Sequence, residues 1–159
     1  MAKVIIKNLS QTERNGLFSL VFEGEILSEF EKFIEKFKCA AEDVRDLNII
    51  LAAINHMMEG AGFLERYFRP EGKMRDGVCA LPIESGRLRL YCLRLSDSIL
   101  IAGNGGHKDT KTYNESAELS GYVISLQNLD KIIKAEVRKG NIIIESGTLE
   151  GIGNKKFSL

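Results

Sequence analysis

Residues 85–115 read SGRLRLYCLRLSDSILIAGNGGHKDTKTYNE, and this stretch organises the fold of the chain. Polar and apolar side chains alternate strictly in its first part, so that one face would carry Arg87, Arg89 and Tyr91, and the other Leu88, Leu90 and Cys92. A period of two is typical of a half-buried β-strand. The polar pair Ser96-Asp97 predicts a turn into a second strand that ends near Ala102. Residues 103–106, which are mostly glycine, predict a tight turn after that strand.

Four residues that suit phosphodiester chemistry follow the predicted turn: His107, Lys108, Lys111 and Tyr113. With a reference pKa of about 6.5, a histidine can accept or release a proton near neutral pH. Lysines stabilise developing negative charge, and a tyrosine hydroxyl donates or accepts a hydrogen bond. Arg87 and Arg89, on one strand face, could hold a phosphate through paired hydrogen bonds. These groups cover the steps by which RNA is cleaved through its own 2′-hydroxyl, with no metal ion and no cofactor. The alternative is that the basic face is only the solvated side of a sheet.

The composition predicts one domain with a single core. The chain has 159 residues, a hydrophobic fraction of 44% and a formal net charge of zero. Zero net charge argues against a protein whose whole surface binds nucleic acid, but basic residues outnumber acidic ones by four between Arg66 and Tyr113. The three cysteines lack metal-binding spacing, and the sequence shows neither a secretory signal nor a long apolar run. We therefore expect buried thiols in a reducing cytoplasm and no membrane association.

Local patterns predict the remaining elements. A capping box, with Ser28 at the N-cap and Glu31 three residues later, begins a first helix. Asp43 is expected to cap a second, well-buried helix that ends near Glu59 before a glycine-rich turn. The other predicted elements are an N-terminal hairpin over 2–8 and 17–22, a strand over 74–83, a helix over 126–137, a strand over 141–145 and a frayed tail over 147–159.

The stretches Gly86–Tyr91, Ile99–Ile101 and Gly106–Tyr113 resemble motifs of the RelE/HigB-type toxins of bacterial toxin–antitoxin systems, a superfamily that includes RelE, ParE and phage-derived toxin-like proteins. The resemblance implies an α+β fold. In that fold a small antiparallel sheet of about four to five strands packs against two N-terminal helices and one C-terminal helix. Residues 1–159 would form a single RelE-like toxin domain with an extra N-terminal hairpin and a C-terminal extension. Both additions, and the neutral charge, depart from the family.

The resemblance also implies a function, the toxin component of a type II toxin–antitoxin system. Such a toxin is an mRNA endonuclease that acts on translating ribosomes and arrests growth. The implied catalytic residues are His107, Arg89 and Tyr113, and the implied RNA-binding residues are Arg87, Lys108 and Lys111. The expected partners are a cognate antitoxin, mRNA and the ribosome, in a homo- or hetero-oligomer. Two alternatives stay open: a toxin-fold protein that binds a gyrase-type target without chemistry of its own, and an interaction domain that docks an acidic partner.

Overall fold

A computed structural model of the chain describes residues 2–71, 76–82, 86–107 and 117–159. Within these residues, seven strands form one mixed sheet in the order β3-β4-β5-β6-β2-β1-β9, and two more form a small separate sheet. The strands are β1 (Lys3–Gln11), β2 (Gly16–Phe22), β3 (Arg69–Pro70), β4 (Val78–Pro82), β5 (Leu88–Ser96), β6 (Ile99–His107), β7 (Ile143–Glu145), β8 (Thr148–Glu150) and β9 (Phe157–Ser158).

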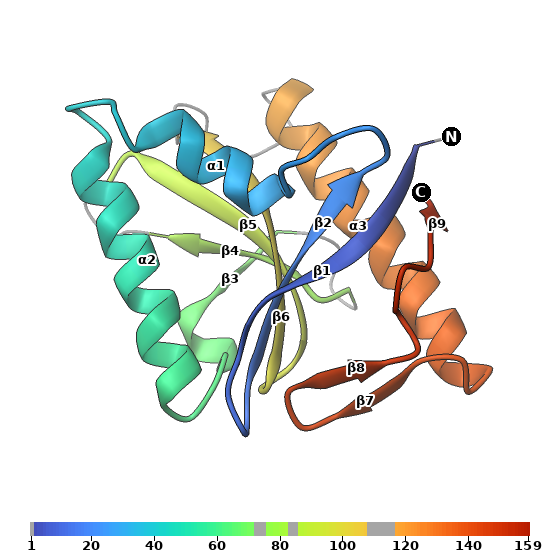
Figure 1. Cartoon of the computed structure of the whole chain (residues 1–159). Helices are drawn as coiled ribbons and strands as arrows, with labels where there is room; N and C mark the ends of the chain where they lie inside the picture. The colour runs from blue at the N-terminus through green and yellow to red at the C-terminus, as the bar shows by residue number, and fades with distance from the viewer. Residues whose placement is uncertain (1, 72–75, 83–85, 108–116) are drawn as a thin grey trace.

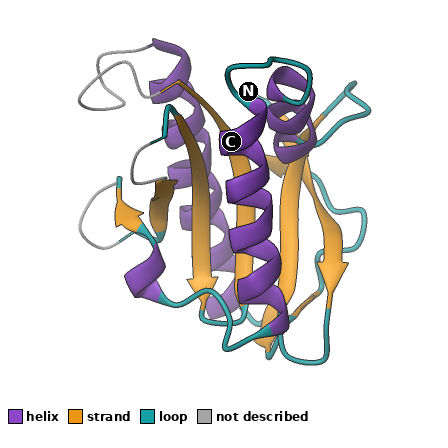
Figure 2. Cartoon of the chain, turned by 90° about the vertical axis from the view of Figure 1, so that its left-hand side faces the viewer, coloured by secondary structure: helices purple, strands orange, loops and turns teal. Residues whose placement is uncertain are grey.

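Helices cover both faces of the large sheet (Figure 1). One face carries α1 (Glu29–Phe37) and α2 (Val44–Glu59), and the other carries α3 (Ala117–Arg138). A short 3₁₀ helix, η1 (Glu65–Tyr67), leads into β3. Figure 2 shows the strands between the helical layers. In the described part of the chain, no helix is both long enough and apolar enough to cross a lipid bilayer.

The alternation predicted for β5 is found, but both of its faces are buried. Leu90 and Cys92 pack in the cluster beneath α1 and α2, and Tyr91 and Leu93 pack in the cluster beneath α3. All four side chains are fully buried. The prediction of a half-buried strand with a solvent-exposed arginine face is therefore wrong. The face that carries Arg89 and Tyr91 is covered by α3.

The predicted fold class, an α+β fold with a small antiparallel sheet, is also wrong. The N-terminal hairpin is part of the main sheet, since β1 pairs with β2 and β2 pairs with β6 in parallel, from Gly16 opposite Ile99 to Ser19 opposite Ala102. The parallel pair arises because the chain crosses over one face through α1 and α2 before the β4-β5-β6 meander returns. β3 and β9 then extend the two edges, so that the sheet has seven strands.

Predictions that rest on neighbouring residues are confirmed. The Oγ atom of Ser28 accepts a hydrogen bond from the backbone N–H of Glu31, and the Glu31 carboxylate accepts one from the backbone N–H of Ser28. This capping box fixes the start of α1. The second helix begins directly after Asp43 and ends before Gly60, as predicted.

Two segments are more ordered than the sequence predicted. α3 begins at Ala117, earlier than expected, because Leu119 and Val123 are buried against the sheet. The tail that was expected to fray forms β8 and β9, and Phe157 pairs with Val4 of β1. Both of these side chains are buried, so apolar contact with the edge of the sheet holds the end of the chain.

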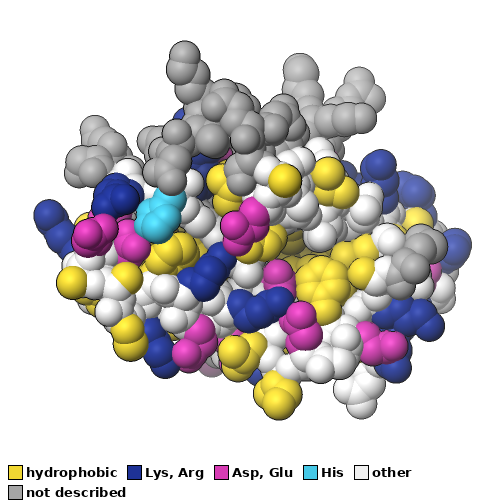
Figure 3. Space-filling view, turned by 90° about the horizontal axis from the view of Figure 1, so that it is seen from above, with side chains coloured by type: hydrophobic (Ala, Val, Ile, Leu, Met, Phe, Trp, Pro, Cys, Tyr) yellow, Lys and Arg dark blue, Asp and Glu magenta, His cyan; other side chains and the backbone are white. Residues whose placement is uncertain are grey.

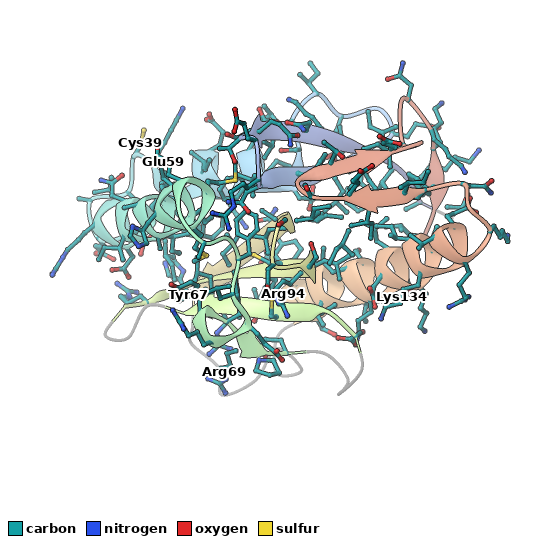
Figure 4. All side chains as sticks on the ribbon, turned by 90° about the horizontal axis from the view of Figure 1, so that it is seen from below. Cys39, Glu59, Tyr67, Arg69, Arg94 and Lys134 are labelled. Atoms are coloured by element: carbon teal, nitrogen blue, oxygen red, sulfur yellow. The ribbon has the colours of Figure 1, made fainter. Side chains whose placement is uncertain are left out.

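The cysteines provide a test of this layered arrangement. Cys39 is exposed in the connection after α1 (Figure 4), whereas Cys79 on β4 and Cys92 on β5 are buried. Burial raises the pKa of the Cys79 thiol to about 12 and raises the pKa of Cys92 well above its ordinary value. We predict that iodoacetamide alkylates Cys39 alone in the folded protein and all three cysteines in urea, as measured by peptide mass spectrometry. Equal labelling of Cys39 and Cys92 in the folded protein would contradict the placement of β5.

Candidate functional site

His107 is the last residue of β6, and its imidazole is paired with a buried carboxylate. The Nε2 atom lies 2.9 Å from Oδ2 of Asp43, which is only 5% exposed. Asp43 occupies the N-cap position of α2, but its side chain makes no capping hydrogen bond and turns to His107 instead. An ionised carboxylate only accepts hydrogen bonds, so Nε2 of His107 is the donor and Nδ1 is left able to accept a proton.

The surroundings of His107 hold its ring while leaving part of it open. The ring of Phe37, at the end of α1, packs edge-on against the imidazole with 5.2 Å between the ring centroids. The His107 side chain is 34% exposed. Figure 3 looks down on this end of the molecule and shows a histidine side chain beside acidic and basic ones at the surface. An oriented and partly accessible imidazole is the arrangement expected of a general base.

A β-bulge in β6 decides which face of the sheet His107 occupies. On one side of the bulge Ala102 pairs with Cys92, and on the other side Gly105 pairs with Leu90. Two residues of β6 therefore lie opposite one residue of β5. One extra residue reverses the alternation of a strand. His107 therefore points to the face of α1 and α2, whereas a regular strand would have turned it to the face of α3.

Gly103 lies in this bulge, and Gly105 and Gly106 pair with β5 just beyond it, so the predicted tight turn is wrong. A Cβ atom on Gly105 would lie 2.0 Å from the carbonyl oxygen of Arg89, and one on Gly103 would lie 3.0 Å from that of Tyr91. Such close approach of two backbones requires glycine. The glycine-rich sequence thus serves strand pairing, and β6 continues through it to His107.

Arg89 lies on the opposite face of the sheet from His107. It shares a face with Tyr91, which packs beneath α3, and it is 2% exposed. Its Nη1 atom lies 3.4 Å from Oε1 of Glu71, which follows β3 and is also buried. Burial raises the pKa of the Tyr91 hydroxyl, against the opposing effect of the neighbouring Arg89 guanidinium. The structure therefore does not bring Arg89 and His107 together in one hollow, as the sequence pattern had predicted.

Arg87 precedes β5 and turns toward the N-terminus of α2. Its backbone N–H donates to Oδ2 of Asp46 at 2.6 Å, and its Nη1 atom lies 3.2 Å from Oε2 of Glu42. Both partners in the Arg87–Glu42 pair are exposed, so the pair contributes little energy and the guanidinium can change partners. Because Glu42 directly precedes Asp43, Arg87 lies on the same side of the molecule as His107.

Three predicted site residues lie outside the described part of the chain: Lys108, Lys111 and Tyr113. Among the described residues, no group of histidine, cysteine and acidic side chains is placed to hold a metal ion. Sequence reasoning identified Asp43 only as a helix cap and missed its role as the partner of His107. No local signal could have shown it, because the two residues are 64 positions apart.

A separate hollow of about 420 Å³ lies between the C-terminal half of α3 and the end of β5. Arg94 and Lys134 line it (Figure 4). Lys134 is paired with the buried Asp130 at 2.8 Å, and Arg94 is paired with Asp97 at 2.9 Å. These charges are balanced within the protein, and the lining residues that the structure describes include no histidine or cysteine for acid–base or nucleophilic chemistry. The best candidate for a chemical site is therefore His107 with Asp43.

Comparisons with known proteins give no independent assignment. A scan against protein-family models found no matching family, and searches of curated proteins and of solved structures found no significant match. We therefore infer the function of the chain from the geometry of the site itself.

Stability measurements on the two arginines test their placement. Arg89→Ala should lower the free energy of unfolding by about 3–5 kcal/mol, because the buried Glu71 carboxylate loses the buried guanidinium beside it. Arg69, at 3.8 Å from Glu71, is largely exposed and offsets little of this loss. Arg87→Ala is the matched control and should cost less than about 1 kcal/mol, since its ion pair is exposed. Urea unfolding followed by circular dichroism measures both values. A loss for Arg89→Ala as small as that of the control would show that Arg89 is not buried.

Proposed function

We propose that this chain is the toxin component of a type II toxin–antitoxin pair, an endonuclease that cuts mRNA on translating ribosomes in the cytoplasm. A cognate antitoxin protein would neutralise it. The observation that carries the proposal is the pairing of the partly exposed His107 with the buried Asp43. Apart from η1 and β3, the order of elements from β2 to α3 is a strand, two helices, three antiparallel strands and a helix. The motifs Gly86–Tyr91 and Ile99–Ile101, on which the resemblance to RelE/HigB toxins rests, lie at the starts of β5 and β6 within this order, and they support the proposal.

In the proposed reaction, Nδ1 of His107 takes the proton from a ribose 2′-hydroxyl, and the 2′-oxygen attacks the adjacent phosphorus. The bond to the 5′-oxygen breaks, giving a 2′,3′-cyclic phosphate and a 5′-oxygen that takes up a proton. Asp43 keeps His107 in the required tautomer and stabilises the imidazolium that forms. We assign protonation of the leaving oxygen to Tyr113, and stabilisation of the charge on phosphorus to Lys108 and Lys111. This scheme requires no metal ion.

We assign the phosphate contact to Arg87 rather than to Arg89. Arg87 is exposed, lies on the side of His107, and can leave its weak pair with Glu42 when a phosphate binds. Arg89 lies on the opposite face of the sheet and forms an ion pair with the buried Glu71. In this proposal Arg89 is a structural residue that joins β5 to the chain after β3.

A second candidate is an interaction protein without nuclease activity, which binds a gyrase-type target or another protein. The acidic side chains around the site favour it. Glu42, Asp43 and Asp46 gather at the N-terminus of α2, and two of them already contact Arg87. A phosphodiester would meet this negative charge, whereas a basic surface of a partner protein would be attracted to it.

The two candidates differ in what they require of His107. Expression without a partner should arrest growth, and the purified protein should cut mRNA on translating ribosomes. His107→Ala should lower the cleavage rate about 100-fold or more, the usual contribution of a general base, and Asp43→Asn should also lower it. The matched control is His56→Ala, which alters the other histidine, exposed on α2, and should keep the wild-type rate. Circular dichroism establishes that each variant is folded.

The outcomes separate the candidates. Growth arrest that persists in His107→Ala while mRNA stays intact would exclude the nuclease and support the interaction protein. The absence of both growth arrest and cleavage with the wild-type chain would overturn the proposal that it is a toxin.

A further inference from the structure

We propose that Lys36 of α1 is a positioning residue for His107, acting through the bulge of β6. For catalysis, this inference rests on the proposed function of His107. The position of the imidazole, however, can be measured without any activity, so the two proposals can fail separately.

The first observation is a direct bond from Lys36 to the bulge. Its Nζ atom donates to the carbonyl oxygen of Gly105 at 2.8 Å. Gly105 is the first residue that pairs with β5 beyond the extra residue, and His107 follows two positions later. The next residue of α1, Phe37, packs against the His107 ring. The last turn of α1 thus sets both the backbone before His107 and the surface on which its ring rests.

The second observation is that the same lysine contacts α3. Nζ of Lys36 lies 3.2 Å from the hydroxyl of Tyr122 and 3.6 Å from Oε1 of Glu118. Tyr122 in turn donates to Glu118 at 2.6 Å. Lys36 therefore joins three elements, α1, the end of β6 and the first turns of α3, although α1 and α3 cover opposite faces of the sheet.

The third observation concerns the cost of this arrangement. The Lys36 side chain is 34% exposed, and burial lowers its pKa, with Glu118 opposing that effect. Burying an ammonium group costs free energy unless it is hydrogen-bonded, and the contacts of Lys36 with Gly105 and Tyr122 offset that cost. Directly after the same helix, at its C-cap, Lys38 forms an exposed pair with Glu35, in which both side chains are about half exposed. Lys38 is therefore a natural control for Lys36.

A second contact steadies the bulge independently. The backbone N–H of Gly105 donates to Oδ1 of Asn104 at 2.8 Å, and Nδ2 of Asn104 lies 3.5 Å from Oε1 of Glu29. Loss of Lys36 should therefore loosen the bulge without unfolding the sheet. This expectation makes Lys36 suitable for a test by substitution.

The experiment compares Lys36→Met, Lys36→Arg and Lys38→Met in the full-length, ¹⁵N-labelled chain. Long-range ¹H–¹⁵N spectra report the tautomer of each imidazole, and the His56→Ala variant identifies the signals of His107. In the wild-type chain and in Lys38→Met, we expect two well-separated nitrogen shifts for His107, as the Asp43 contact requires. In Lys36→Met the two shifts should converge, and RNA cleavage should fall about 10-fold from misplacement of the base. Lys36→Arg, which keeps the donors, should restore both.

Each result bears on the inference. Separated His107 shifts in a folded Lys36→Met protein would overturn it. Tyr122→Phe supplies a milder variant, which keeps the Lys36–Gly105 bond and should leave the tautomer unchanged. If His107→Ala has no effect on growth arrest, the proposed nuclease function fails, but the nitrogen shifts still decide the role of Lys36.

Discussion

One extra residue in β6, between Ala102 and Gly105, determines the arrangement of the candidate site. In a regular antiparallel pair every second residue faces the same way, so His107 would have shared a face with Arg89. The bulge reverses this alternation, so that His107 lies on the face covered by α1 and α2. Arg89 and His107, which lie close together on the paired strands β5 and β6, are thereby placed on opposite faces of the sheet.

The N-terminus of α2 adapts to this arrangement. Asp43 gives up a capping hydrogen bond, which is usually worth about 1 kcal/mol, and bonds to His107. The positive end of the helix dipole still favours the buried carboxylate. Asp46 and Glu42 hold Arg87 at the same end of the helix. The end of β6, the start of β5 and the start of α2 are thus fastened together by polar contacts, while apolar packing holds the remainder of each layer.

The sequence predicts features that depend on neighbouring residues, but not features that depend on residues far apart in the chain. The capping box at Ser28, the helix after Asp43 and the alternation of β5 depend on neighbouring residues, and all three are confirmed. The parallel pairing of β2 with β6 joins residues more than eighty positions apart, and no local pattern reveals it. The glycines at 103–106 fit a turn and a bulge equally well, because glycine adopts a positive φ in a turn and permits close backbone approach in a paired strand. His107 was therefore identified as a candidate, while its partner and its face were not.

The central claim is that His107 lies on the face of the sheet covered by α1 and α2. Nuclear Overhauser effects test this placement most directly. On the face of α1, the ring of Phe37 packs against that of His107, with the two ring centroids 5.2 Å apart. On the opposite face, Leu119 of α3 lies above Gly106. The bulged strand predicts cross-peaks between the imidazole protons of His107 and the ring protons of Phe37, with none to the methyl groups of Leu119. Cross-peaks to Leu119 in place of Phe37 would contradict the account.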